Sequence, residues 1–125
     1  MANNSFFLKF GPGTIASGDT SPIVKASTLY GGFTVVKATL FPGIAGTLDT
    51  VLQNYGVSGT VAGGTVAGIS GGSAALVADT AVDLAITAAN AFIDDGEWLV
   101  LKAVAAALGE AVIVVECVPG VVSQG

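Results

Sequence analysis

The sequence of 125 residues predicts a mainly β protein, and three of its features support this fold class. Apolar and polar residues alternate at period two, most clearly over residues 82–87, VDLAIT. Pro-Gly pairs at residues 42–43 and 119–120 end apolar runs, as turns do between strands. The chain is also rich in Val and Thr, which favour strands. We therefore expect one antiparallel β domain.

Residues 1–26 are predicted to form an extended N-terminal arm, which precedes the β domain over residues 27–125. Turn-forming sequences occur in this segment at residues 11–13, GPG, and at residues 17–22, SGDTSP. The large apolar side chains near its start are those of Phe6, Phe7, Leu8 and Phe10. Because the periodicity of the segment is weak and its turn chemistry is strong, we expect extended chain here.

The first strand of the β domain is predicted over residues 34–41, and it has two distinct faces. One face carries Val36, Ala38 and Leu40, and the other carries Val35, Lys37 and Thr39. The pair Pro42-Gly43 then ends the strand. A second strand is expected over residues 48–55, and residues 82–87 form a further strand with one core face and one polar face.

Two strands are predicted in the last third of the chain. Residues 94–96, DDG, predict a turn into a strand over residues 97–101, and a Val/Ile-rich strand follows over residues 111–118. These two strands could pair as a hairpin. A helix over residues 97–108 is the alternative, because an Asp precedes it and Gly109 could cap its end.

Two Ala-rich or Gly-rich segments leave further alternatives open. Residues 74–91 fit a helix by Ala content, but the alternation of Val82, Leu84 and Ile86 favours a strand. Residues 59–72 contain the tetrapeptide TVAG twice and are dense in Gly. We expect them to form a long loop or a twisted hairpin at the rim of a sheet, on the exterior or at a subunit contact.

Residue usage argues against an enzyme. The chain contains no His and no Arg, one Cys and four Lys, whereas catalytic bases, metal sites and phosphate contacts mostly use these side chains. A Ser-His-Asp triad is excluded outright. The single thiol, Cys117, lies in an apolar run and is predicted to be a core residue. We expect a structural protein with no catalytic residue, no metal and no cofactor.

The charge balance argues against nucleic acid and membranes as partners. The formal net charge is −5 and the isoelectric point about 4.1, which would oppose binding to phosphate backbones or anionic lipids. Residues 50–78 are uncharged but contain recurring Gly, Ser, Thr, Gln and Asn, so they do not predict a membrane-spanning helix. Charged residues make up only 10% of the chain, which suggests that apolar surface is left for partner proteins.

Four local patterns have a chemical interpretation and a simpler structural one. GPGTIA at residues 11–16 fits a dinucleotide-binding pattern, but no helix pattern follows it. Asp94, Asp95 and Glu97 could share a hard cation, although a turn is favoured. A glycoside-hydrolase carboxylate pair would come from Asp79, Asp83, Glu110 and Glu116. A sugar-stacking platform would use Trp98, Tyr30, Tyr55 and Phe92, for which core packing is favoured.

Several segments together resemble the small capsid decoration, or cement, proteins of tailed bacteriophages. They are the N-terminal arm, FTVVKA at residues 33–38, the Gly-rich middle, NAFIDDGEWLVL at residues 90–101, and the Val-rich run that ends in VPG at residues 118–120. The resemblance covers roughly residues 30–120 and rests on layout, without a catalytic motif.

The resemblance implies a jelly-roll-like β-sandwich on the outer surface of the virion, with three subunits around a local threefold axis and arms that extend over the major capsid protein. On this hypothesis Phe6, Phe7, Leu8 and Phe10 anchor the arm, and the protein stabilises the shell by burying area at capsomer junctions. A tail or baseplate component, or a carbohydrate-binding virion module, are the alternative functions.

Overall fold

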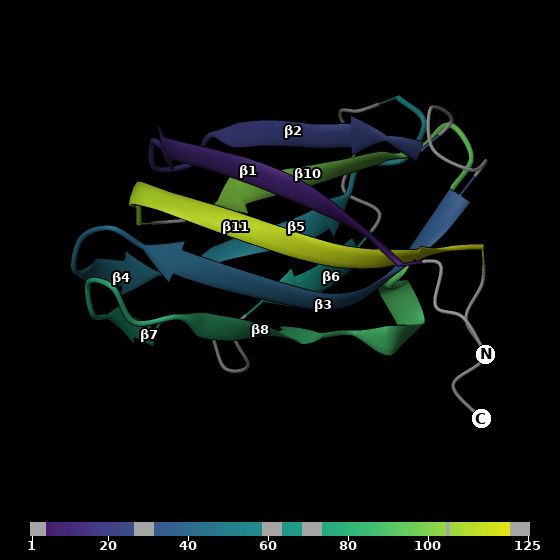
Figure 1. Ribbon diagram of the computed structural model, residues 1–125. Coiled ribbons are helices and arrows are strands. Elements are labelled where there is room, and N and C mark those ends of the chain that lie inside the picture. The colour runs from purple at the N-terminus through teal and green to yellow at the C-terminus, as the bar shows by residue number, and fades with distance from the viewer. Residues whose placement is uncertain (1–4, 27–31, 59–63, 69–73, 105, 121–125) are drawn as a thin grey trace.

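The computed structural model describes residues 5–26, 32–58, 64–68, 74–104 and 106–120. They form a mainly β fold, as the sequence predicts (Figure 1). In chain order its elements are β1 (Phe6–Ile15), β2 (Thr20–Lys25), β3 (Gly32–Pro42), β4 (Gly46–Leu48), β5 (Thr50–Asn54), β6 (Gly64–Gly68), β7 (Ala74–Leu76), β8 (Val82–Ile86), the 3-10 helix η2 (Ala88–Asn90), β9 (Phe92–Asp94), β10 (Trp98–Ala103) and β11 (Leu108–Pro119).

The strands form a sandwich of two antiparallel layers. Neighbours pair in the order β1-β11-β3-β8-β6-β5-β10-β2, while β9 pairs with the start of β3. In Figure 1 the layer of β1, β11, β3 and β8 lies in front of the layer of β6, β5, β10 and β2. Because β8 pairs with both β3 and β6, it joins the layers along one side. Strands β4 and β7 form a separate two-stranded sheet.

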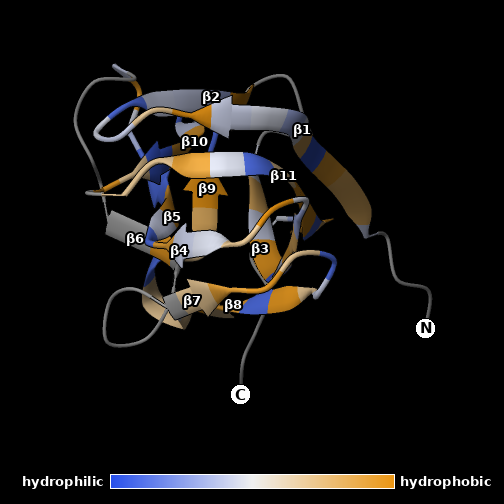
Figure 2. Cartoon of the chain, turned by 90° about the vertical axis from the view of Figure 1, so that its left-hand side faces the viewer, coloured by the Kyte–Doolittle hydropathy of each residue, from blue (hydrophilic) through white to orange (hydrophobic). Residues whose placement is uncertain are grey.

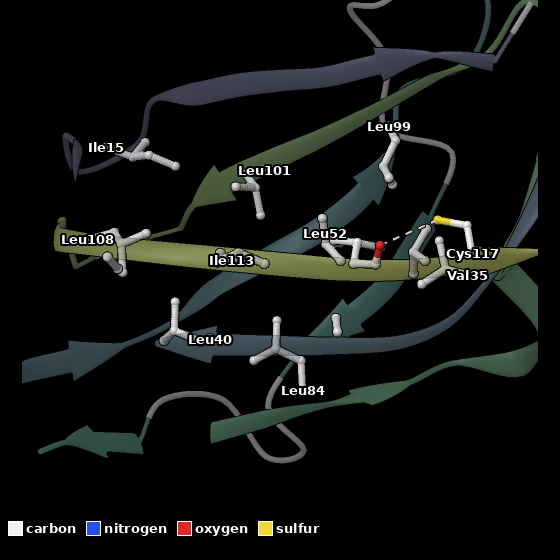
Figure 3. Packing of buried hydrophobic residues seen from close by; sticks show 14 of the residues in the cluster. Ile15, Val35, Leu40, Leu52, Leu84, Leu99, Leu101, Leu108, Ile113 and Cys117 are labelled. Carbon is white, nitrogen blue, oxygen red and sulfur yellow. Dashed lines mark hydrogen bonds between the residues drawn. The ribbon is translucent and has the colours of Figure 1, made fainter. Parts of the chain in front are cut away.

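The core lies between the two layers and is built from alternate residues of each long strand. In β10 the side chains of Leu99 and Leu101 are fully buried, and in β11 those of Ile113 and Val115 are. Figure 3 shows Leu99 and Leu101 of one layer and Ile113 of the other pointing into the space between the layers. Each fully buried Leu or Ile contributes about 1.5–3 kcal/mol relative to an exposed one. Period-two alternation is therefore what gives the sandwich its stability.

Strand β3 contains a β-bulge that the sequence pattern did not show. Val35 points into the core before the bulge, whereas Ala38 and Leu40 do so after it, and Val36 is 36% exposed. The register with β11 shifts at the same place. The prediction that Val36 shares a face with Ala38 and Leu40 is therefore wrong, because one extra residue reverses the alternation.

The structure does not confirm the extended arm predicted over residues 1–26. Its described part forms β1, which pairs with β11, and β2, which pairs with β10. The two strands are joined at residues 16–19, where the Gly18 N–H donates to the Ala103 carbonyl oxygen at 2.7 Å. This segment is therefore an integral part of both layers. Residues 1–4 lie outside the described part of the chain.

The hairpin and the helix considered for the last third are both wrong. Residues 97–108 contain β10, which pairs with β5 and β2 as a strand, and not a helix. Strand β10 lies between β5 and β2 in one layer, while β11 lies between β1 and β3 in the other. Residues 104–107 thus connect two layers and do not close a hairpin.

Several local predictions are confirmed. Strand β8 presents Leu84 to the core and Asp83 to solvent, β3 ends at Pro42, and residues 95–96 form a turn. The Gly-rich segment, however, differs from the predicted loop or hairpin at the rim. Its described residues 64–68 form β6, which lies between β5 and β8 in the pairing order, and Val66 is fully buried. The rest of the predicted loop, residues 59–63 and 69–72, lies outside the described residues.

Prolines occur in the two strands that end the pairing order. Pro12 lies in β1, at a register shift with β11, and Pro22 lies in β2. Proline has no N–H to donate to a neighbouring strand, so it is tolerated at sheet edges and at irregular positions.

Candidate functional site

The four apolar residues predicted to anchor an arm do not form one surface. Phe6, Leu8 and Phe10 pack against the core, and the Phe6 ring meets the Phe33 ring edge-on at a centroid distance of 5.7 Å. Phe7 points to the opposite side of β1 and is 63% exposed. Three of the four side chains therefore face the core, because the alternation of β1 turns them inward. Contact of these residues with a partner stays a prediction.

A different set of exposed apolar side chains gathers at one end of the sandwich. We call this end, with the connections after β3, β7 and β10, the apolar end. Its large exposed side chains are those of Ile44, Val77 and Val104, at 51%, 62% and 50% exposure. Figure 2 looks onto this end, where hydrophobic orange stretches face the viewer. The three residues lie far apart in the sequence, so no sequence pattern revealed the group.

Backbone hydrogen bonds fix the frame that carries these side chains. The Gly43 N–H donates to the Glu110 carbonyl oxygen at 2.8 Å, and the Asp79 N–H donates to the Pro42 carbonyl oxygen at 2.9 Å. The Ile44 side chain lies where a Cβ of Gly109 would stand, so the absence of a side chain at Gly109 gives it room. Ile44 is therefore held in place although half of it is exposed.

A side-chain hydrogen bond also holds the connection after β10. The Ala106 N–H donates to Asp49 Oδ2 at 2.9 Å, which ties this connection to the segment between β4 and β5. Val104 lies in the same connection, between the end of β10 and Ala106. Its exposed side chain is thus presented from a connection that is anchored to the segment before β5.

The opposite end of the sandwich, which we call the polar end, is organised by hydrogen bonds. Glu97 Oε1 accepts from Asn54 Nδ2 at 2.9 Å and from the Asp94 N–H at 2.8 Å. Asn54 Oδ1 accepts from the Gly56 N–H at 2.7 Å. The carboxylate of Glu97 thus ties the turn before β10 to the end of β5. Val57 is also exposed at this end.

The acidic residues singled out from the sequence have local structural roles or lie apart. Asp94 and Glu97 belong to the hydrogen-bonded turn, and no group of three metal-ligating side chains occurs among the described residues. Of the four proposed carboxylates, Asp83 accepts from Thr39 Oγ1 at 2.9 Å. Glu110 and Glu116 lie near opposite ends of β11, and Asp79 lies in the turn before β8. The structure does not pair these carboxylates around a cleft.

The predicted aromatic platform is not assembled. Tyr55 is only 9% exposed, and Lys25 Nζ lies 5.9 Å from the centroid of the Trp98 ring. Phe92 is partly buried next to η2, and Tyr30 lies outside the described residues. A cation over an aromatic face is itself a favourable arrangement. The Trp98 ring is thus already partnered by a side chain of the same chain.

Cys117 is confirmed as a core thiol. It is fully buried, and its Sγ donates to the Val115 carbonyl oxygen at 3.9 Å (Figure 3). Burial, and after it the negative charge of Glu116, raises the pKa of the Cys117 thiol to about 12. Since the thiolate is the nucleophilic form, this thiol is protonated and inert at neutral pH.

The glycines at residues 11–16 lie within β1, at its irregular pairing with β11, and precede no helix. No helix in the described part of the chain is long and apolar enough to cross a membrane. No family model, curated protein or solved structure matches the sequence or the fold of this chain.

Proposed function

We propose that this protein is a non-enzymatic structural subunit of a tailed-phage virion, a decoration protein that binds the outside of the head shell. The observation that carries the proposal is the apolar end, where Ile44, Val77 and Val104 are exposed on a hydrogen-bonded frame. Exposed apolar clusters on small domains mark contacts with other proteins. The apolar end is therefore the surface that we assign to the major capsid protein.

We also propose that the sandwich is a jelly roll. Eight strands support this interpretation, because the first pairs with the last, the second with the seventh, the third with the sixth and the fourth with the fifth. These pairs are β1 with β11, β2 with β10, β3 with β8, and β5 with β6. Such a fold is frequent in viral capsid proteins and lectins.

The composition fits a protein that works in many copies on a large assembly. Only 10% of residues are charged, and the net charge of −5 does not favour contact with packaged nucleic acid. A cement protein needs buried area and no chemistry, since its binding free energy is added to the stability of the shell. We propose a trimer as its working form, because three linked copies bind far more tightly than one.

Localisation on virions tests this function. Antibodies raised against the purified chain are applied to intact particles of the phage that encodes it, followed by electron microscopy. Labelling over the outer surface of the head is expected. Labelling confined to the tail or baseplate would replace the proposal with the tail alternative, and unlabelled particles that also lack the chain by mass spectrometry would overturn both.

A variant then tests the docking surface. The triple substitution Ile44→Ser, Val77→Ser and Val104→Ser is expected to abolish rebinding to heads that have been stripped of the protein. The matched control is Val57→Ser, because Val57 is 68% exposed but lies at the polar end. The control should rebind normally. Normal rebinding of the triple variant would show that another surface contacts the shell.

Light scattering coupled to size exclusion measures the assembly in solution. We expect the mass of three chains of 12.2 kDa. A larger closed ring would favour a tail role. A monomer would show that trimers form only on the capsid, and it would remove the trimer from the proposal as a property of the free protein.

A further inference from the structure

A shallow groove crosses the outward face of β1, β11 and β3, away from the apolar end's connections. We call it the outer groove; its volume is about 170 Å³. Its lining residues are Phe7, Lys37, Thr39, Phe41, Val114 and Glu116. This face is the one turned toward the viewer in Figure 1. These side chains do not pack in the core, because all of them point away from the opposite layer.

Register places the lining residues in successive rows across the sheet. Phe7 lies opposite Glu116, which lies opposite Lys37, so one aromatic and two oppositely charged side chains share a row. The next row carries Val114 and Thr39. Side chains directly opposite each other in antiparallel strands stand close enough to interact. The groove therefore has charged groups beside an apolar floor.

Two phenylalanines line the groove from different strands. Phe7 on β1 is 63% exposed and Phe41 on β3 is 47% exposed, which is unusual for side chains of this size. Phe41 lies opposite Val112 of β11, four residues along the strand from the position opposite Phe7. The two rings therefore stand at diagonal corners of the groove, with Val114 between them.

The charges on this face balance. Lys37 and Glu116 neighbour each other in the groove, and Lys9 and Asp83 share the row of Val114 and Thr39. A groove with paired charges does not favour an anion or a cation. It offers instead ammonium donors and carboxylate acceptors to a neutral ligand with hydroxyl groups. Aromatic faces provide the apolar contact that such a ligand also needs.

We propose that the outer groove binds one ring of a neutral sugar, such as a terminal hexose of a surface glycan. The apolar face of the ring packs on Phe7 beside Val114, while its hydroxyl groups bond to Lys37 and Glu116, which share the row of Phe7. The groove has a volume of about 170 Å³, so the ligand is assigned by the one ring that contacts these side chains. This activity goes beyond the structural role and would let a virion subunit contact a cell surface.

NMR titration of the ¹⁵N-labelled protein tests the proposal. The probes are the methyl glycosides of glucose, galactose and N-acetylglucosamine, each added separately. At least one is expected to shift the amide signals of β1, β3 and β11 around Val114 in a saturable way, and to leave those of β5 and β10 unchanged. Absence of any saturable shift in this panel would overturn the proposal.

Charged probes and variants sharpen the test. Sialic acid and glucosamine should bind more weakly than the best neutral sugar, and tighter binding of either would overturn the assignment to a neutral ligand. Phe7→Ala should weaken binding about tenfold, which corresponds to about 1.4 kcal/mol. Phe41→Ala, which changes a row farther along the groove, should weaken it by less. Val57→Ala, which removes exposed apolar surface at the polar end, should bind sugar unchanged.

The same variants separate this proposal from the structural role. Phe7→Ala with Phe41→Ala should rebind to stripped heads normally, because the apolar end remains intact. If the double variant fails to bind heads and sugar leaves the NMR spectrum of the parent protein unaltered, the groove contacts the capsid protein. That result would overturn the sugar proposal. Loss of sugar binding alone supports it.

Discussion

The two ends of the sandwich are built differently. At the polar end, the Glu97 carboxylate and the Asn54 amide hold the turn before β10 by hydrogen bonds of 2.7–2.9 Å. At the apolar end, Ile44, Val77 and Val104 expose half or more of their surface. Among the described residues, the connections of the polar end carry one large exposed apolar side chain, Val57, whereas those of the apolar end carry three. Under the proposed function, stability and attachment depend on opposite ends of one domain.

The largest effect is expected at the polar end. Glu97→Ala removes the acceptor of two hydrogen bonds and should lower the free energy of unfolding by about 2 kcal/mol, because bonds to charged groups are worth about 1.5–3 kcal/mol. Urea denaturation measures the change. The matched control is Glu110→Ala, an exposed carboxylate at the apolar end, which should change stability by less than about 0.5 kcal/mol. Equal effects at both ends would contradict the comparison.

The buried thiol of Cys117 should make the free energy of unfolding depend on pH. The pKa of Cys117 is about 12 in the folded chain, against an ordinary value of 9.0. The unfolded thiol therefore ionises first, so stability contributed by this group is complete below pH 9 and is lost as the pH rises toward 12. The expected loss is roughly 1 kcal/mol per pH unit in this window.

The measurement is the difference in unfolding free energy between the parent protein and Cys117→Ala from pH 8 to pH 11. The variant should be less stable at neutral pH, because it leaves a cavity, and the gap should narrow as the pH rises. Titration of lysines and tyrosines is common to both chains and cancels. A gap that stays constant with pH would show that the thiol is not protected from ionisation.

Two buried threonines allow the same substitution to be compared at the two ends. Thr34 Oγ1 donates to the Gly120 carbonyl oxygen at 2.7 Å at the polar end, so Thr34→Val should destabilise the fold by about 1 kcal/mol. Thr50, at the start of β5 near the apolar end, has a buried hydroxyl without a hydrogen-bond partner among the described residues. Thr50→Val should therefore be neutral or stabilising by up to about 1 kcal/mol. Thermal unfolding measures the stability change of each variant. Changes of the same sign in the two variants would contradict the prediction.

The smallest effect on stability is expected from the apolar end. Each of Ile44→Ser, Val77→Ser and Val104→Ser should change the free energy of unfolding by no more than about 0.5 kcal/mol, since surface substitutions rarely do more. Urea denaturation of the three single variants gives the values. A loss above 1 kcal/mol for any of them would mean that its side chain supports the fold, and the loss of head binding could then no longer be attributed to docking.

The fold class could be predicted because it depends on local periodicity. The alternation in β8 and the end of β3 at Pro42 depend on neighbouring residues alone. The bulge at Val36 and the separation of β10 from β11 could not be predicted, because both are set by pairing with strands distant in sequence. Sheet register is a long-range property, and a local pattern cannot specify it.

The candidate site was harder to predict than the fold. Phe6, Leu8 and Phe10 looked available because β1 lacks a clear alternation of polar residues, yet they pack against the core, and the Phe6 ring contacts the Phe33 ring. Ile44, Val77 and Val104 were missed because they lie far apart in the sequence, and only the fold brings their connections to one end. In the outer groove, Phe7 is shared with the sequence prediction, whereas Phe41 was expected only as part of a strand.

Pro12 and Pro22 have a consequence for the edges of the sandwich. They lie in β1 and β2, the strands at the two ends of the pairing order. In a chain that is 52% hydrophobic, an unpaired edge is a template on which a strand of another copy can add. Each proline lacks one N–H donor, so neither edge strand offers a complete backbone ladder to such a strand.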